Sequence, residues 1–155
     1  MTPATLDRAG IAARIPHAGA MCLLDRMTSW RDDAIECVAV NHRDPRHPLR
    51  SASGLLASAT IEYAAQAMAL HGVLAGAAAA RAAAPGVLAS ARDVRLACWR
   101  LDDLPRADPD VLVVAAERHA ADATRILYAF SVRHGGRELA SGRVTVVLDA
   151  LASAR

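Results

Sequence analysis

The stretch Ile61-Glu62-Tyr63-Ala64-Ala65-Gln66 lies within a run from Gly54 to Ala84 that is mostly alanine and carries very few charges. An acidic residue is almost never buried without a partner or a task, so Glu62 is a candidate functional residue. Gln66 lies one turn further along the same helix face, because positions i and i+4 are neighbours. The run therefore predicts one long, largely buried helix that carries a carboxylate. The three polar side chains Glu62, Gln66 and His71 make it a poor membrane span.

A histidine upstream is the candidate partner of that carboxylate. His17 stands in the stretch Ile15-Pro16-His17-Ala18-Gly19-Ala20, a Pro-His-x-Gly sequence that favours a loop over a helix or strand interior. A loop histidine and a helix carboxylate together indicate acid–base chemistry on an apolar substrate. Each residue also has a structural interpretation: Glu62 could pair with Arg92 or Arg95, and His17 could be an ordinary surface residue.

Elements with strand character flank the expected helix on both sides, which predicts an α+β protein with an antiparallel sheet wrapped around that helix. A short helix over 6–14, capped by Thr5, comes first, and the long helix should end near Pro85-Gly86. His134-Gly135-Gly136-Arg137 is the clearest hairpin turn, because paired glycines accept positive φ. The strands are expected at 21–30, 34–41, 87–101, 111–119, 125–134 and 137–148, and the tract 75–84 as a fraying helix end or a loop.

Composition narrows the classes of function. The 155 residues predict a single domain, with a core over about 12–148. The hydrophobic share of 54% includes only two Trp, two Tyr and one Phe, so we expect further burial against another subunit. All 18 basic residues are arginine, which excludes Schiff-base lysine chemistry and the phosphate-loop lysine. A net charge of +2 without a basic, aromatic-rich run argues against nucleic-acid binding.

Cysteine use and the chain start predict a cytoplasmic protein without cofactor or metal. Three widely separated cysteines suit neither a disulfide framework nor a zinc site, and the first residues lack the order of a signal peptide. His42, Asp44 and His47 could be imagined as metal ligands, but prolines and arginines among them favour an exposed loop. His71 falls on the helix face opposite Glu62 and is expected to be packed. Ser58 lacks the Gly-x-Ser-x-Gly context of a hydrolase.

Two strings of the chain resemble a known family. The segment from Ile15 to Arg26, with its Pro-His and its Leu-Leu-Asp-Arg, and the Glu-x-x-x-Gln of 62–66 are similar to the hotdog-fold 3-hydroxyacyl-acyl carrier protein dehydratases. The branch associated with aryl polyene biosynthesis is the most similar. By order of elements, the resemblance covers about 12–148. The stretch from His42 to Leu49 departs from the family's Gly-His-Phe-Pro, which leaves the acyl entrance undefined.

The resemblance implies a hotdog fold and a dehydration reaction. It implies that His17 is the general base and Glu62 the general acid, and that the pair comes from opposite subunits of a homodimer. Gln66 is then expected to orient the carboxyl group or a water, and Gly54 and Leu55 to contribute to substrate binding. N–H groups near Leu55 to Ser58 at the helix start could stabilise the enolate. An exposed patch of Arg43, Arg46 and Arg50 is expected either to dock an acyl carrier protein or to be a solvated loop.

Two other classes of function remain open at this level. A hotdog acyl thioesterase would use the same glutamate to activate water or attack the thioester, although His17 would then have no evident task. A non-catalytic acyl-thioester-binding module, or a subunit that completes a heteromer with another hotdog chain, is the second. The alternatives differ in their products: an enoyl thioester, a free thiol, or none.

Overall fold

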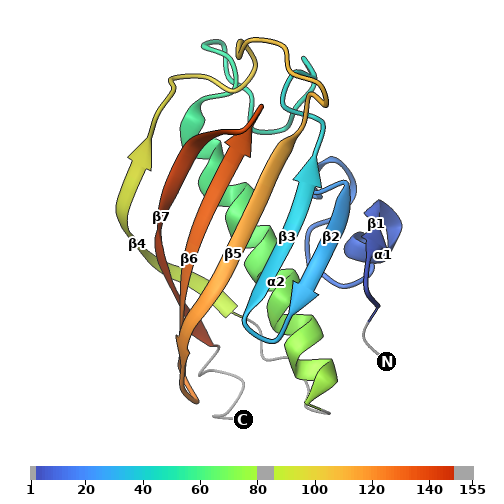
Figure 1. The fold of residues 1–155 in the computed structure, drawn as a ribbon, viewed down its shortest axis with the longest axis vertical. Helices are drawn as coiled ribbons and strands as arrows, with labels where there is room; N and C mark the ends of the chain where they lie inside the picture. Colours follow the sequence, from blue (N-terminus) through green and yellow to red (C-terminus); the bar gives the residue numbers. More distant parts are fainter. Residues whose placement is uncertain (1–2, 80–85, 149–155) are drawn as a thin grey trace.

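The computed structural model describes residues 3–79 and 86–148, which form a curved antiparallel sheet around one long helix (Figure 1). Its helices are α1 (Arg8–Ala12) and α2 (Thr60–Ala78), with short 3-10 turns η1 (Gly19–Met21) and η2 (Ala57–Ala59). Its strands are β1 (Leu6–Asp7), β2 (Arg26–Arg31), β3 (Ala34–Ala39), β4 (Gly86–Leu96), β5 (Leu112–Ala121), β6 (Arg125–His134) and β7 (Arg137–Leu148). This arrangement confirms the expected hotdog fold.

The sheet has the strand order β1-β2-β3-β5-β6-β7-β4, and every neighbouring pair is antiparallel. β4, the strand that follows α2, lies at the edge beside β7, whereas β3 pairs with β5. The chain therefore crosses behind the sheet as α2 before it returns at the far edge, and Figure 1 shows the sheet curling around the helix. The single sheet wraps the helix from one side only.

The core lies between α2 and the concave face of the sheet. Side chains alternate along strands, so one set faces the helix and the other faces away. The buried sets include Ile35, Cys37 and Ala39 of β3, Leu112, Val114 and Ala116 of β5, and Tyr63, Ala67, Leu70 and Leu74 of α2. Full burial of one such leucine stabilises the fold by roughly 1.5–3 kcal/mol.

His71 belongs to this core. It is fully buried, its Nδ1 lies 2.8 Å from the Tyr128 hydroxyl, and its Nε2 lies 3.0 Å from the Arg31 carbonyl oxygen. Burial lowers the pKa of His71 and raises that of Tyr128 to about 12. The prediction that His71 is a packed residue on the face opposite Glu62 is therefore confirmed.

The opposite side of α2 is less covered. Ala65, Ala69, Val73 and Gly76 are only half-buried, although the sequence predicts a helix that is apolar nearly all round. These residues are available for burial against another chain, as expected from the small number of aromatic residues.

The structure corrects several element boundaries. The N-terminal helix is α1 alone, and its cap is Asp7 rather than Thr5, because the Asp7 carboxylate accepts the Gly10 amide at 2.8 Å. The strand expected from Met21 begins only at Arg26, since η1 and an extended segment precede it. α2 ends at Ala78, before the predicted stop at Pro85-Gly86; Pro85 and the tail of the alanine tract lie outside the described residues.

The second half of the sheet agrees better with prediction. β6 and β7 have the predicted limits, and the hairpin between them contains Gly135 and Gly136 at φ +56° and +77°. β4 is shorter than predicted, since it ends at Leu96 instead of Leu101. The residues after it form an irregular segment that packs on the start of α2, where Trp99 and Leu101 bond to Ala57 and Leu55. No helix among the described residues is long and apolar enough to cross a membrane.

Candidate active site

His17 and Glu62 meet within one chain. The Nε2 of His17 lies 3.2 Å from Oε1 of Glu62, with 26% and 35% of the two side chains exposed. Glu62 is in the first turn of α2, and His17 is in the loop between α1 and η1. The expectation that the two come from opposite subunits is wrong for this chain, because one chain assembles the pair. The carboxylate is also more accessible than its apolar helix predicts.

Gln66 holds the two parts of the pair together. Its amide nitrogen donates to the Met21 carbonyl oxygen at 2.7 Å and to Oε1 of Glu62 at 3.2 Å, while its own oxygen accepts the Leu23 amide at 2.9 Å. Gln66 is fully buried, so these bonds are not in competition with water. One side chain thus fixes the loop that carries His17 and contacts the carboxylate that faces it.

The Leu-Leu-Asp-Arg string anchors the far end of the His17 loop. Leu23 and Leu24 are completely buried, and Asp25 accepts the Val40 amide at 2.7 Å and pairs with Arg8 at 3.3 Å. The near end is held by Ile15, which is also buried. The segment from Ile15 to Arg26 and the Glu62–Gln66 turn are therefore one structural unit. Ile15 and the Leu-Leu-Asp-Arg sequence hold the two ends of the His17 loop, and Gln66 binds that loop to α2.

His17 itself has one free nitrogen. Its Nδ1 is buried and finds no hydrogen-bond partner among the described residues. The alternative partners Arg92 and Arg95 lie on β4, and the ion pairs of the described residues do not join either of them to Glu62.

A pocket of about 270 Å³ opens beside Glu62. Its other lining residues are Leu49, Ser51, Leu56, Ser58 and Ala59. Most of this lining is apolar, and the carboxylate is its only ionisable group. Such a pocket suits an apolar chain that must present one reacting position to an acid or base.

The segment before α2 provides fewer free N–H groups than expected. The Leu55 amide donates to Asp102 at 3.0 Å and the Ala57 amide donates to the Trp99 carbonyl oxygen at 2.9 Å. Leu56 and Arg100 face each other between these bonds as a pair without a direct hydrogen bond, so the Leu56 N–H points away from the segment that carries Arg100. Leu56, Ser58 and Ala59, but not Leu55, are the residues of this segment that line the pocket.

Gly54 and Leu55 come just before Leu56 and do not themselves line the pocket. Both are buried, and Gly54 has φ +94°. This φ favours glycine, and a Cβ here would also lie 2.5 Å from Nε of Arg100, so a larger residue would have to displace that side chain. Arg100 and Arg50 both pair with Asp102, at 2.7 and 3.0 Å. The pKa of Asp102 is held well below its usual range, chiefly by its hydrogen bond with Arg100.

The predicted arginine patch is largely internal. Arg43 donates to both oxygens of Asp110, at 2.7 and 3.0 Å, and Arg50 binds Asp102. Only Arg46 is fully exposed, at 91% of its side chain. The interpretation of all three as an exposed docking patch is therefore wrong. The sequence signal that could have shown this is the acidic loop from Asp102 to Asp110, whose charge complements the arginines.

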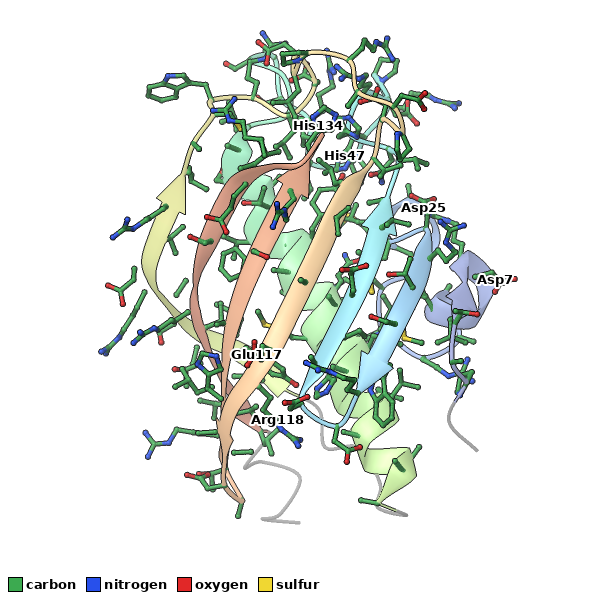
Figure 2. The ribbon with its side chains drawn as sticks, viewed as in Figure 1. Asp7, Asp25, His47, Glu117, Arg118 and His134 are labelled. Atoms are coloured by element: carbon green, nitrogen blue, oxygen red, sulfur yellow. The ribbon has the colours of Figure 1, made fainter. Side chains whose placement is uncertain are left out.

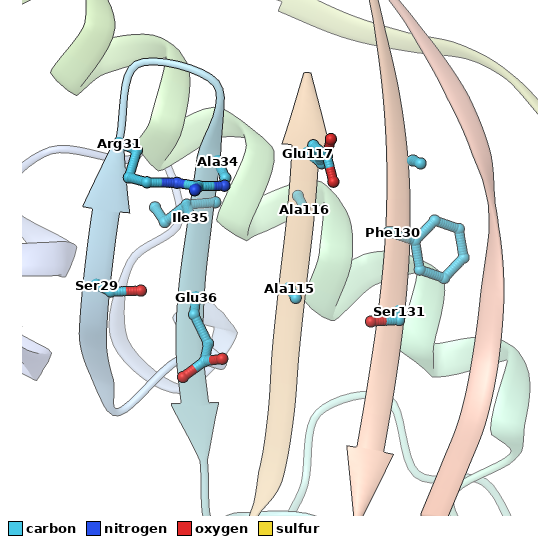
Figure 3. A pocket seen from close by; sticks show the side chains of 11 residues that line it. Ser29, Arg31, Ala34, Ile35, Glu36, Ala115, Ala116, Glu117, Phe130 and Ser131 are labelled. Atoms are coloured by element: carbon cyan, nitrogen blue, oxygen red, sulfur yellow. The ribbon is translucent and has the colours of Figure 1, made fainter. Parts of the chain in front are cut away.

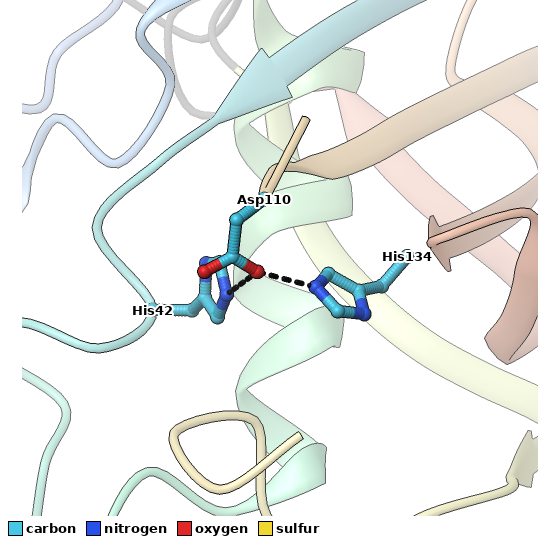
Figure 4. Close-up of side chains that lie close together, drawn as sticks. All are labelled: His42, Asp110 and His134. Atoms are coloured by element: carbon cyan, nitrogen blue, oxygen red, sulfur yellow. Dashed lines mark hydrogen bonds and ion pairs between the residues drawn. The ribbon is translucent and has the colours of Figure 1, made fainter. Parts of the chain in front are cut away.

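A second cluster of histidine and carboxylate lies at the end of the sheet where the loops gather (Figure 4). His134 Nε2 lies 2.7 Å from Oδ1 of Asp110, and His42 Nε2 lies 3.5 Å from the same oxygen. The loop from His42 to Leu49 is exposed at Pro45, Arg46 and Pro48, as predicted, but its two histidines are almost completely buried, as is His134.

His42, Asp110 and His134 could offer ligand atoms to a metal, since these atoms lie within 4.8 Å of one another. The same carboxylate already binds Arg43 on both oxygens, and Arg106 lies 3.3 Å away. A divalent cation would be repelled by two guanidinium groups at this position. The donor set therefore suits a buried ion pair better than a metal.

A larger hollow of about 540 Å³ lies on the sheet face that points away from α2 (Figure 3). Arg31, Glu36 and Glu117 are its charged lining residues, among serines and alanines. It has no histidine, and neither His17 nor Glu62 reaches it. Of the two hollows, only the smaller is lined by a residue of the His17–Glu62 pair, namely Glu62.

Comparisons with known proteins agree with this assignment of the fold. The family model described as ApeP-like, ApeP dehydratase, matches residues 9–154. A search of curated proteins finds no sequence match. Among solved structures, the dehydratase heterocomplex ApeI:P from Xenorhabdus doucetiae is similar with a TM-score of 0.78 at 21% identity, over 92% of each chain.

Two thioesterases share the fold at lower similarity. Zebra fish thioesterase superfamily member 2 matches with a TM-score of 0.64 at 14% identity, over 93% of this chain and 99% of that one. A hypothetical thioesterase from Streptococcus pneumoniae TIGR4, solved with coenzyme A, has a TM-score of 0.56 at 16% identity, over 79% and 84% of the two chains. At such identities these likenesses concern the fold alone.

Proposed function

The chain belongs to the ApeP-like dehydratase family, and from that premise we propose that it dehydrates a 3-hydroxyacyl thioester carried on an acyl carrier protein. The product is the trans-2-enoyl thioester, and the pathway is aryl polyene or fatty-acid-like synthesis in the cytoplasm. The observation that carries the proposal is the His17–Glu62 pair, 3.2 Å apart, whose carboxylate lines an apolar pocket of about 270 Å³.

In this reaction His17 removes a proton from C2 of the substrate, and Glu62 donates a proton to the hydroxyl group at C3. The C3–O bond breaks, water leaves, and the C2=C3 double bond forms. C2 and C3 are bonded neighbours, so two groups that lie close together can act on both. A histidine suits the first step because its pKa lies near neutrality in general, and hydroxide needs an acid in order to leave.

The same contact explains how the enzyme could reset. After one turnover His17 holds the proton and Glu62 has lost one. With the two side chains 3.2 Å apart, the proton can pass from the imidazole to the carboxylate once the product has left. Gln66, at 3.2 Å from Glu62, keeps the carboxylate oriented during this exchange.

The enolate that forms on the thioester oxygen needs hydrogen-bond donors. Leu56 and Ser58 are the candidates, since they line the pocket and precede α2, whose positive end lies there. Gly54 and Leu55 contribute to substrate binding indirectly, by holding this segment in place against Arg100 and Asp102.

A second hotdog subunit is the partner that we propose, either a copy of this chain or a related one. The edge strand β4 has almost no buried residue, and Val87, Leu88 and Leu96 are exposed on it at 65%, 37% and 44%. Exposed apolar edges of this kind are normally covered. The structural similarity to a dehydratase heterocomplex supports a partner of the same fold.

The test is the ultraviolet absorbance of the protein mixed with a 3-hydroxyacyl thioester on carrier protein. Growth of the conjugated enoyl signal is expected with the unmodified protein and should be lost in His17→Ala and in Glu62→Gln. Release of free thiol without enoyl product would replace the proposal by a thioesterase. No reaction, alone or with a related hotdog subunit present, would indicate a non-catalytic binding module.

A further inference from the structure

His47 is the centre of a buried hydrogen-bond chain beside the pocket. Its Nε2 lies 2.8 Å from the Tyr63 hydroxyl, and that hydroxyl donates to Oδ1 of Asn41 at 2.6 Å. Its Nδ1 accepts the Leu49 amide at 3.1 Å. Both His47 and Tyr63 are buried, and Figure 2 shows His47 at the same end of the sheet as His134.

The bonds on the two sides of the ring require the same tautomer. Tyr63 has one hydroxyl proton and gives it to Asn41, so His47 must donate from Nε2. The Leu49 amide donates to Nδ1, which must therefore be without a proton. Burial, the largest influence, lowers the pKa of His47 and favours this neutral ring.

The chain joins the reacting carboxylate to the pocket wall. Tyr63 follows Glu62 on α2, so its ring points into the core while Glu62 faces the pocket. Leu49, at the other end, lines that pocket. The loop that contains His47 forms consecutive turns. The His47 amide donates to the Asp44 carbonyl oxygen, and the Arg50 amide donates to the His47 carbonyl oxygen.

We propose that His47 is a positioning residue, which sets the distance between the Leu49 wall and Glu62 and so determines which acyl chains enter the pocket. It does not exchange protons with the substrate, because both ring nitrogens are occupied by protein partners. This inference rests on the proposed function, since it assigns the acyl chain to the pocket beside Glu62.

Two substitutions test the hydrogen bonds of Nδ1 and Nε2 separately. In His47→Asn, a carboxamide oxygen near the place of Nδ1 can still accept the Leu49 amide. In His47→Gln, the longer amide can reach Tyr63 and leaves the Leu49 amide without its acceptor. Tyr63→Phe removes the hydroxyl that bonds to His47 and Asn41 but leaves the bond between His47 and Leu49 intact. It shows whether the core tolerates the loss of that hydroxyl.

The first measurement compares kcat, KM and the pH dependence of the rate for a short and a long 3-hydroxyacyl chain. His47→Gln should raise KM for the long chain by about fivefold, the effect of one ordinary hydrogen bond. Its kcat and pH profile should match those of the unmodified protein, and His47→Asn should restore KM. A lost limb of the pH profile would make His47 a proton-transfer group, and an unchanged KM would remove it from the pocket; either result overturns the inference.

A binding measurement separates this inference from the proposed function. The probe is a long acyl-pantetheine amide without a 3-hydroxyl group, which cannot be dehydrated, and its affinity is measured by titration calorimetry. If the unmodified protein has no dehydratase activity but binds the probe about fivefold more tightly than His47→Gln does, the reaction is wrong and the role of His47 stands. If it dehydrates substrate and both proteins bind the probe equally, the role of His47 is wrong. A His47→Gln protein that fails to fold shifts the same comparison to Tyr63→Phe, for which equal binding again overturns the inference.

Discussion

Two regions of this protein pair histidine with a carboxylate, and they are built for different purposes. His17 and Glu62 lie 3.2 Å apart with 26% and 35% of their side chains exposed, and Glu62 lines a pocket. His134 and Asp110 lie 2.7 Å apart with 4% and 22% exposed, and Arg43 binds both carboxylate oxygens. The pKa of Asp110 is held well below its usual range, first by the Arg43 hydrogen bond and then by that of His134.

The difference shows that surroundings decide what a histidine–carboxylate pair can do. The lowered pKa of Asp110 favours its ionised form, which does not suit an acid, and Asp110 lines neither of the two pockets described. Among the ion pairs of residues 3–79 and 86–148, none joins Glu62 to an arginine, and Glu62 lines a pocket. Under the proposed function the first region exchanges protons with a ligand, whereas the second joins the loops that carry Arg43 and Asp110 to the end of β6.

The largest expected effect distinguishes the two regions by rate. His17→Gln should lower the dehydration rate by about a hundred- to ten-thousandfold, the usual contribution of a general base, and leave the melting temperature nearly unchanged. The matched change His134→Gln should leave the dehydration rate nearly unchanged and lower the melting temperature. Kinetics and thermal melting of both proteins check this. Equal loss of rate in the two variants would mean that the regions are not separate.

The next effect distinguishes them by stability. Asp110→Ala leaves Arg43 and His134 without their shared partner and should lower the free energy of unfolding by roughly 2–4 kcal/mol. Glu62→Ala, its matched control, should change it by no more than about 0.5 kcal/mol, since the side chain is a third exposed. Urea unfolding of both variants is the measurement. A Glu62→Ala protein as unstable as Asp110→Ala would give the candidate site a structural role.

A smaller effect concerns pH. Burial lowers the pKa of His42, His47 and His71 from the ordinary value of 6.5, so all three favour the neutral form in the folded protein. The unfolded chain binds protons first as pH falls, hence the free energy of unfolding should be constant above pH 6.5 and decrease below it. Asp102 and Asp110, with lowered pKa values, should add a further loss only below about pH 3.8.

Urea midpoints measured across this pH range test the sign. The His47→Gln variant should show a shallower decrease below pH 6.5, because one of the three titrating groups is gone. Stability that rises as the pH falls from neutrality to about 5.5, one unit below the ordinary histidine pKa of 6.5, would contradict the assignment of neutral buried rings.

The smallest expected effect is that of metal. Zinc added to the protein should leave its melting temperature unchanged, because Arg43 and Arg106 already neutralise the carboxylate between His42 and His134. A chelator should likewise leave both stability and rate unchanged. A melting temperature that rises with zinc concentration and no longer does so in His42→Ala would show that the cluster binds metal after all.

Local patterns were enough to predict much of the fold. The apolar run around Glu62 predicts α2, and the paired glycines at 135 and 136 predict the hairpin between β6 and β7 with its correct limits. The errors lie where a tertiary contact overrides a local preference. Asp7 replaces Thr5 as a cap because the chain pairs with β2 until Asp7, and β4 stops at Leu96 because the next residues bond to the start of α2.

The candidate site was also readable in part. His17, Glu62 and Gln66 carry unusual residue types for their surroundings, so their importance shows in the sequence, and one helical turn relates the last two. Asn41, His47 and Asp102 carry no such signal. Each is an ordinary loop residue until folding brings it to Tyr63 or to Leu55.

The sequence by itself determined the type of protein: a buried helix with a carboxylate, a loop histidine, and strands enough to wrap the helix. These depend on periodicity and residue type, which act over a few neighbours. Only the folded chain shows that His17 reaches Glu62 in the same chain, that Arg43 and Arg50 pair with Asp110 and Asp102, and that Asp110 is an ion-pair partner of Arg43 and His134. Such outcomes depend on distances and burial between segments far apart in the chain, and these arise only when the chain is packed.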